Sequence, residues 1–98
     1  MKREQALQRL RAEERALRSF SVKRLAIFGS VARNEAREGS DIDILMEFQP
    51  GAHVGLFQFV RLQRFLSEVL DCQVDLATPD ALRKEMREQI LREAIDAA

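Results

Sequence analysis

The chain has 98 residues, 46% of them hydrophobic, which suits the core of one domain and is too little for two. With Cys72 as its only cysteine, the chain cannot form an intrachain disulfide. No run resembles a signal peptide or approaches the roughly 18 apolar residues of a membrane span. We therefore expect a cytoplasmic protein without membrane contact. The 16 basic and 16 acidic side chains balance, so no basic excess favours direct binding to nucleic acid.

The first half of the chain predicts a helix, a strand and a short helix. Residues 2–19 place leucines three and seven positions apart among charged residues, the spacing of one apolar helical stripe. The segment VKRLAIFG (22–29) is a short apolar run ended by glycine, which favours a buried strand. Residues 30–37 are expected to form one or two helical turns, with Ser30 as the N-cap.

The second half predicts two strands and two helices. The segment DIDILMEF (41–48) alternates between aliphatic and mostly acidic positions, as a strand with one buried face does. Residues 55–70 have the apolar content of a buried helix, and CQVDLAT (72–78) is a further short strand. A last helix, running to about residue 96, is expected to have Thr78 as its N-cap and the proline that follows at N1. Its apolar stripe is formed by Leu82, Met86, Ile90, Leu91 and Ile95.

The predicted order is therefore α-β-α-β-α-β-α over residues 1–98, without a repeat or a linker. This order predicts a single α/β (α+β) domain in which helices flank a small mixed sheet of three or four strands.

Two aspartates stand one residue apart at the start of the second strand. Asp41 and Asp43 should point to the same face, with their Cα atoms roughly 6–7 Å apart. Carboxylates this close repel each other unless a cation lies between them or one is protonated. Oxygen ligands favour Mg²⁺ or Mn²⁺ over zinc, and two such ions are the arrangement that serves in-line displacement at phosphorus.

The flanking residues complete a candidate phosphate site. Gly29 and Ser30 come where a strand ends and a helix begins, a place where backbone N–H groups bind phosphate. Arg33 lies one turn further and could neutralise a polyphosphate, while Ser40 adds a hydroxyl beside the aspartates. If the third strand lies beside the second, Asp75 supplies a third carboxylate.

Each of these residues also has a plainer interpretation. Asp41 and Asp43 could be the solvated face of a strand, and Asp75 could form a surface ion pair. Arg33, among many arginines, could be an ordinary surface residue. The combination of three acids, a glycine-serine turn and an arginine makes the functional interpretation the stronger one.

The segments GSVAR (29–33) and GSDIDIL (39–45) resemble the GS-x-x-R…S-D-x-D signature of the DNA polymerase β-like nucleotidyltransferase superfamily. The length of the chain resembles the minimal nucleotidyltransferase (MNT) proteins within it. The resemblance covers nearly the whole chain and implies the polymerase β-like nucleotidyltransferase fold. It includes the motif positions Gly29, Ser30, Arg33, Ser40, Asp41, Asp43 and Asp75.

The resemblance implies a nucleotidyl transfer that uses ATP as substrate. The β- and γ-phosphates would bind at Gly29, Ser30 and Arg33, with Ser40 nearby, and the three aspartates would hold two Mg²⁺ (or Mn²⁺) ions. A hydroxyl would attack the α-phosphorus, take up AMP and release pyrophosphate. Whether Asp75 accepts the proton of that hydroxyl or only binds metal stays open.

The resemblance also implies a partner, because MNT proteins typically act as antitoxins that attach AMP to a tyrosine of a HEPN-domain toxin. The chain has no tyrosine of its own, so self-modification on tyrosine is excluded. One alternative function is a non-catalytic module that neutralises its partner by binding it. Another is transfer to RNA or to a small molecule. With any of these functions, the chain could form a homo- or hetero-oligomer.

Overall fold

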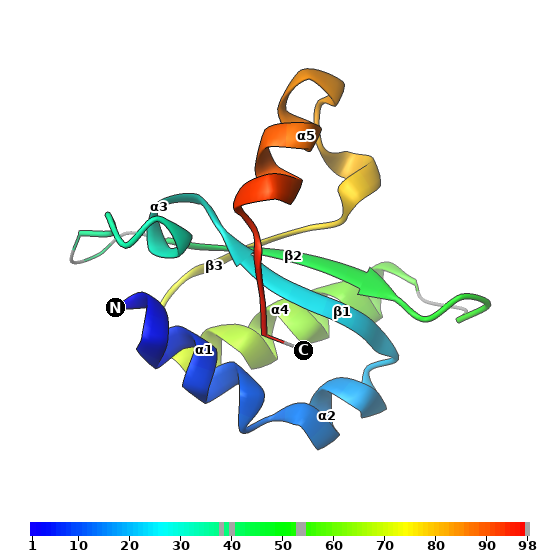
Figure 1. Cartoon of the computed structure of the whole chain (residues 1–98). Helices are drawn as coiled ribbons and strands as arrows, with labels where there is room; N and C mark the ends of the chain where they lie inside the picture. The colour runs from blue at the N-terminus through cyan, green and yellow to red at the C-terminus, as the bar shows by residue number, and fades with distance from the viewer. Residues whose placement is uncertain (38, 40, 53–54, 98) are drawn as a thin grey trace.

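A four-stranded mixed sheet forms the centre of the molecule in the computed structural model, which describes residues 1–37, 39, 41–52 and 55–97. The strand order is β3-β2-β1-β4 (Figure 1). The strands are β1 (Val22–Phe28), β2 (Ile42–Phe48), β3 (Val74–Ala77) and β4 (Ile95–Asp96). The expected mixed sheet flanked by helices is thereby confirmed, with four strands.

The helices cover the two faces of the sheet unequally. Three of them, α1, α2 and α4, lie on one side of the sheet, and α5 stands over the other side (Figure 1). The short α3 follows β1 directly, at one end of the sheet. The helical segments are α1 (Arg3–Arg11), α2 (Glu14–Ser19), α3 (Gly29–Ala32), α4 (Leu56–Leu70), the 3₁₀ turn η1 (Pro79–Ala81) and α5 (Lys84–Glu93).

Strand alternation separates a packed face from a polar face. On β2, Ile42, Ile44 and Met46 are buried in the main core, together with leucines of α1 and α4. Residues between them point the other way, because successive side chains of a strand alternate. Asp43 is only half-buried there, while Leu45 is buried outside the main core cluster. The sheet face under α5 is therefore polar at the end where Asp43 lies, and it has a small apolar area around Leu45.

Strand pairing brings the acidic ends of β2 and β3 together. β1 runs antiparallel to β2, and Phe28 stands opposite Asp43. β2 runs parallel to β3, and Asp43 stands opposite Asp75. Residues that pair across strands point to the same face. The expectation that the third strand lies beside the second is therefore confirmed.

The predicted helix over residues 2–19 is wrong in one respect, because it is two helices. α1 ends at Arg11 and α2 begins at Glu14. Leu10 and Leu17 are both buried, but the residues between them include no large apolar side chain that could hold the chain against the sheet. The break therefore falls in the charged stretch. The expected N-cap at Ser30 is also wrong, since Phe28 occupies that position and Ser30 lies within α3.

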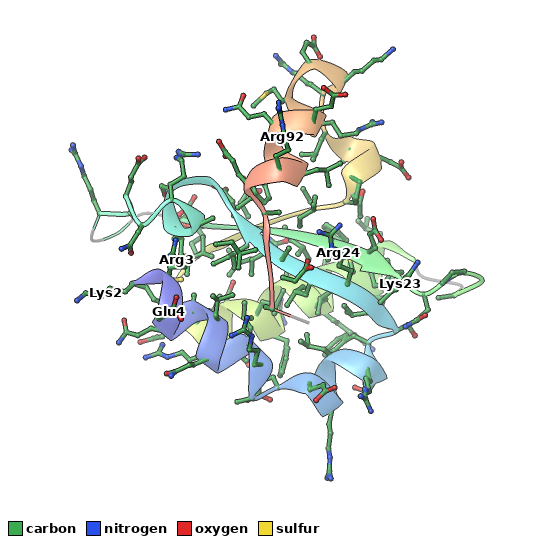
Figure 2. All side chains as sticks on the ribbon, viewed as in Figure 1. Lys2, Arg3, Glu4, Lys23, Arg24 and Arg92 are labelled. Carbon is green, nitrogen blue, oxygen red and sulfur yellow. The ribbon has the colours of Figure 1, made fainter. Side chains whose placement is uncertain are left out.

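The predicted last helix, from Thr78 to about residue 96, is wrong at both ends, although Thr78 is an N-cap as expected, of a 3₁₀ turn. Pro79 opens a 3₁₀ turn, and α5 covers only ten residues, Lys84–Glu93. The chain then becomes extended and Ile95–Asp96 pairs with β1, which satisfies backbone groups of an otherwise open sheet edge. Arg24, in the middle of Figure 2, fastens this strand by an ion pair of 2.8 Å to Asp96.

No helix among the described residues is both long and apolar enough to cross a membrane.

The packed face should carry most of the stability, and a matched pair of leucines on α4 tests this. Leu66 is fully buried, whereas Leu56 is 75% exposed. Leu66→Ala should lower the free energy of unfolding by about 2–5 kcal/mol, because it removes apolar contacts and leaves a cavity. Leu56→Ala should change it by less than about 0.5 kcal/mol. Urea denaturation measures both; equal losses would mean that α4 does not use this face for packing.

Candidate functional site

The turn between β1 and α3 places the backbone directly against a carboxylate. Gly29 has a φ of +72°, a conformation that favours glycine. A Cβ atom at Gly29 would overlap Oδ2 of Asp43, so any other residue would force the carboxylate away. Ser30 follows, half-buried, in the first turn of α3. The first residues of a helix leave backbone N–H groups without an intrahelical partner, so this turn can donate to an anion.

Three aspartates gather around this turn. Asp43 is half-buried beside Asp75, its partner on β3, and Asp41 lies two residues earlier. Asp41 and Asp75 are exposed. Burial raises the pKa of Asp43, and the charges of Asp75 and Asp41 raise it further, whereas Arg33 lowers it. The charges of all three neighbours therefore act on Asp43, and its ionised form is unfavourable unless a cation is near.

The donor set suits a hard divalent cation that also binds the substrate. Among the residues that the structure describes, no group of three His, Cys, Asp or Glu side chains forms a ready-made metal site. Mg²⁺ seldom uses such all-protein cages, since it keeps water molecules and binds through one or two carboxylates plus substrate phosphates. The adjacent pair Asp43 and Asp75, with Asp41 nearby, fits this mode of binding.

Arg33 bridges α3 and α5. Its Nε donates to Oε2 of Glu35 at 3.1 Å, and its Nη1 donates to Oε2 of Glu93 at 3.2 Å. The hydrogen bond that Arg33 donates to Glu35 and the charges of Glu93 and Glu35 raise the pKa of Arg33, so the guanidinium is always charged. Within the described part of the chain, these contacts use two of its five N–H donors, which leaves others for an anion.

A pocket of about 210 Å³ adjoins these groups. Gly29, Arg33 and Asp43 line one part of it, and α5 supplies much of the remainder. The lining residues of α5 are Met86, Gln89, Ile90 and Glu93. Sequence analysis missed this contribution, because the segment was interpreted only as an amphipathic helix with an apolar stripe.

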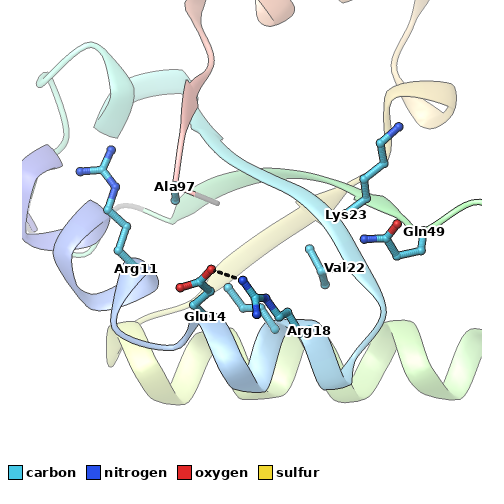
Figure 3. Close-up of a pocket in the computed structure, with 8 residues that line it drawn as sticks. Arg11, Glu14, Arg18, Val22, Lys23, Gln49 and Ala97 are labelled. Carbon is cyan, nitrogen blue, oxygen red and sulfur yellow. Dashed lines mark hydrogen bonds and ion pairs between the residues drawn. The ribbon is translucent and has the colours of Figure 1, made fainter.

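A larger pocket, of about 420 Å³, lies elsewhere, between the first two helices and β1 (Figure 3). Its lining includes none of the predicted site residues that the structure describes. Its only acid, Glu14, is paired with Arg18 at 2.6 Å, and Arg11 donates to the backbone of Asp96. The pocket has no carboxylate pair or glycine turn, so the smaller pocket is the better candidate site.

The structure thus brings five predicted residues to one end of the sheet: Gly29, Arg33, Asp41, Asp43 and Asp75. Ser30 lies on the same turn. Ser40 lies outside the described residues, so its place at the phosphates stays a prediction.

Comparison with known proteins gives this arrangement a family. The model of the nucleotidyltransferase domain matches residues 7–97. The chain belongs to the nucleotidyltransferase domain family. The family predicted from the motif is therefore confirmed, and the protein is an enzyme of the nucleotidyltransferase class.

Two archaeal relatives are similar over most of their length. A Methanocaldococcus jannaschii protein, named as a candidate protein adenylyltransferase, is 48% identical over 80 residues, which are 82% of this chain and 84% of the relative. The protein adenylyltransferase MntA of Thermococcus cleftensis is 36% identical over 87 residues, which are 88% and 86% of the two chains.

Solved structures share the fold. A structure described as a candidate minimal nucleotidyltransferase has a TM-score of 0.81 and 39% identity, covering 97% of this chain and 95% of its own. A toxin–antitoxin structure with AMP-PNP has a TM-score of 0.69 and 21% identity, covering 87% and 68%. At that identity, the second likeness concerns the fold alone.

The raised pKa of Asp43 predicts a pH-dependent stability effect. An ionised Asp43 opposes folding, so this penalty is absent below the ordinary aspartate pKa of 3.8 and grows as the pH rises through the raised, folded-state pKa. In metal-free buffer, Asp43→Asn should therefore raise the melting temperature at pH 7 by about 2–6 °C. The gain should vanish at low pH. Glu47→Gln, on the same strand and face, is the control; a gain independent of pH would contradict the electrostatic cause.

Proposed function

We propose that the protein is a Mg²⁺-dependent protein adenylyltransferase, which transfers AMP from ATP to a hydroxyl group of a partner protein. The observation that carries the proposal is the position of Asp43, which lies against the Gly29 backbone and between the charges of Asp75, Asp41 and Arg33. The ionised form of such a carboxylate is unfavourable in the protein alone. It becomes favourable when a cation binds together with the nucleotide.

Each side chain has a defined task in this proposal. Arg33 and the N–H groups of the Gly29–Ser30 turn bind the β- and γ-phosphates, with the hydroxyl of Ser30 as a further donor. We also assign the hydroxyl of Ser40 to the phosphates. The three aspartates hold two Mg²⁺ ions, for which Mn²⁺ can substitute, and bound metal supplies neutralisation of the phosphate charge.

The reaction exchanges a phosphoanhydride bond of ATP for a phosphoester bond to the acceptor. The acceptor oxygen forms a bond to the α-phosphorus, and the bond from that phosphorus to the oxygen of the β-phosphate breaks. Pyrophosphate leaves from the Arg33 side, so the arginine stabilises its growing charge. We assign to Asp75, which is exposed on the edge strand, the role of receiving the proton of the acceptor hydroxyl directly or through water.

The acceptor that we propose is a tyrosine of a cognate HEPN-domain toxin, which would make the protein an antitoxin. Support comes from the relatives named as protein adenylyltransferases and from the fold shared with an antitoxin-containing complex. The chain itself has no tyrosine, so a tyrosine acceptor must come from another molecule.

Label transfer tests the enzymatic proposal. The protein, Mg²⁺, α-labelled ATP and the product of the neighbouring gene are incubated together, and label on that product is measured. Asp43→Asn should reduce the transfer rate at least about a hundredfold, because a carboxylate that would hold the metal is lost and the phosphate charge is then poorly neutralised. Glu47→Gln, on the same strand and face, should retain the rate. Undiminished transfer by Asp43→Asn would remove Asp43 from catalysis.

A second candidate function is neutralisation of the partner by binding alone. The observation in its favour is the exposed apolar surface at the start of α4, where Leu56 is 75% and Phe57 is 83% exposed. Such side chains are common at protein interfaces.

Partner protection separates the two functions. The double variant Asp41→Ala/Asp43→Ala should lose protection of the partner if the chemistry is required, measured as growth of cells that express both proteins. Phe57→Ser should leave label transfer from ATP to a small hydroxyl acceptor unchanged. Full protection by the double variant, together with loss of protection by Phe57→Ser, would establish binding as the mechanism.

A further inference from the structure

One wall of the candidate site has no role in the function proposed above. Met86, Gln89 and Ile90, all from α5, line the pocket of about 210 Å³ whose opposite side contains Gly29 and Asp43. Phe28, at the end of β1, lines it as well. The pocket therefore joins a charged part, suited to phosphate and metal, to a part built from apolar side chains and one amide.

Met86 leaves apolar surface accessible on this wall of the pocket. Met86 is 51% exposed although it lines a pocket, whereas Ile90, one turn further along α5, is only 9% exposed. Ile90 thus anchors the helix while Met86 offers a flexible apolar surface. Methionine adapts to flat ring systems and makes favourable sulfur–aromatic contacts.

Gln89 adds a directional group to the same wall. Its side chain is exposed, and its Nε2 donates to Oε1 of Glu93 on the same helix at a long 3.3 Å. The amide nitrogen carries two N–H donors, so Gln89 can donate to a ligand while it keeps its bond to Glu93. A glutamine amide presents a donor and an acceptor side by side.

We propose that this wall of α5 is the nucleobase subsite, and that it selects adenine. The base packs against Met86 and Phe28, and the amide of Gln89 pairs with the base edge. This inference rests on the proposed function, in which the triphosphate lies on Gly29 and Arg33. The pocket has apolar surfaces and few polar groups, which is the usual composition of a small-molecule site.

The chemistry of the amide explains the selection. Adenine presents an N6–H donor beside the N7 acceptor, and glutamine can pair with both at once. Guanine presents two acceptors, O6 and N7, at the same edge, so the amide oxygen of glutamine finds no donor there. ATP should therefore bind better than GTP.

The ion pair between Arg33 and Glu93 positions the subsite relative to the phosphates. It joins the turn that begins at Gly29 to the end of α5 at 3.2 Å, and Glu93 also accepts from Gln89. The amide that meets the base and the guanidinium that meets the phosphates are thus held by one carboxylate.

Competition binding with three ligands tests the subsite. ATP, GTP and inorganic tripolyphosphate, each with Mg²⁺, are titrated into the wild-type protein and its variants, and folding is checked by circular dichroism. The variants are Gln89→Leu and Met86→Ala. The matched control is Leu91→Ala, on the same helix, 36% exposed and outside the pocket lining.

The three ligands separate base from phosphate. Gln89→Leu should weaken ATP binding at least about fivefold and remove the preference over GTP, since a bidentate pair is lost. Met86→Ala should weaken ATP and GTP alike, about threefold or more, through lost packing. Tripolyphosphate affinity should not change in either variant, and Leu91→Ala should match the wild type for every ligand.

Three results would overturn the subsite. The first is ATP binding unchanged in both variants, and the second is an equal loss for ATP and tripolyphosphate. The third is unchanged ATP binding with a raised KM for the acceptor, which would assign the wall to the acceptor. If the wild type binds no Mg-ATP and transfers no label, the proposed function itself fails; a normal wild type with unaffected variants sinks only the subsite.

Discussion

The approach of the Gly29 backbone to the Asp43 carboxylate is the contact on which the site depends. It exists because β1 and β2 pair antiparallel with Phe28 opposite Asp43, so the end of one strand meets the beginning of the other. A side chain at position 29 would overlap the carboxylate, and the φ of +72° favours glycine independently. One glycine therefore satisfies a steric and a conformational requirement, and both bring backbone donors beside a carboxylate.

Packing on the other face of the sheet offsets the unfavourable electrostatic free energy at this end. Asp43 is partly buried beside two other acids, and its raised pKa reflects the resulting cost. Its neighbours along β2, Ile42 and Ile44, are fully buried against α1 and α4. Because side chains alternate along a strand, β2 places apolar residues in the core on one side and an unfavourably charged carboxylate on the other.

Much of this arrangement could be predicted from the sequence, because it depends on local patterns. The alternation in DIDILMEF predicts which residues of β2 face the core, and the glycine-serine turn predicts the candidate site beside that strand. The position of Asp75 needed the further assumption that β3 lies beside β2, which the parallel register confirms.

The missed parts depend on contacts that no local pattern encodes. β4 has two residues, too few for alternation to be visible, and it forms because β1 offers an open edge. The role of α5 in the pocket was missed because an amphipathic stripe does not reveal which wall it meets. Met86 belongs to that stripe yet is half exposed at the site.

The weak attachment of α5 explains why Arg33 is engaged before any phosphate arrives. Ile90 is the buried apolar residue of this helix, so hydrophobic contact alone holds it lightly. Glu93 would add negative charge to a region that already contains Asp43 and its acidic neighbours, and Arg33 offsets it at 3.2 Å. The same guanidinium lowers the pKa of Asp43. Arg33 therefore balances the charges of two elements at once, and a bound triphosphate would shift that balance in both.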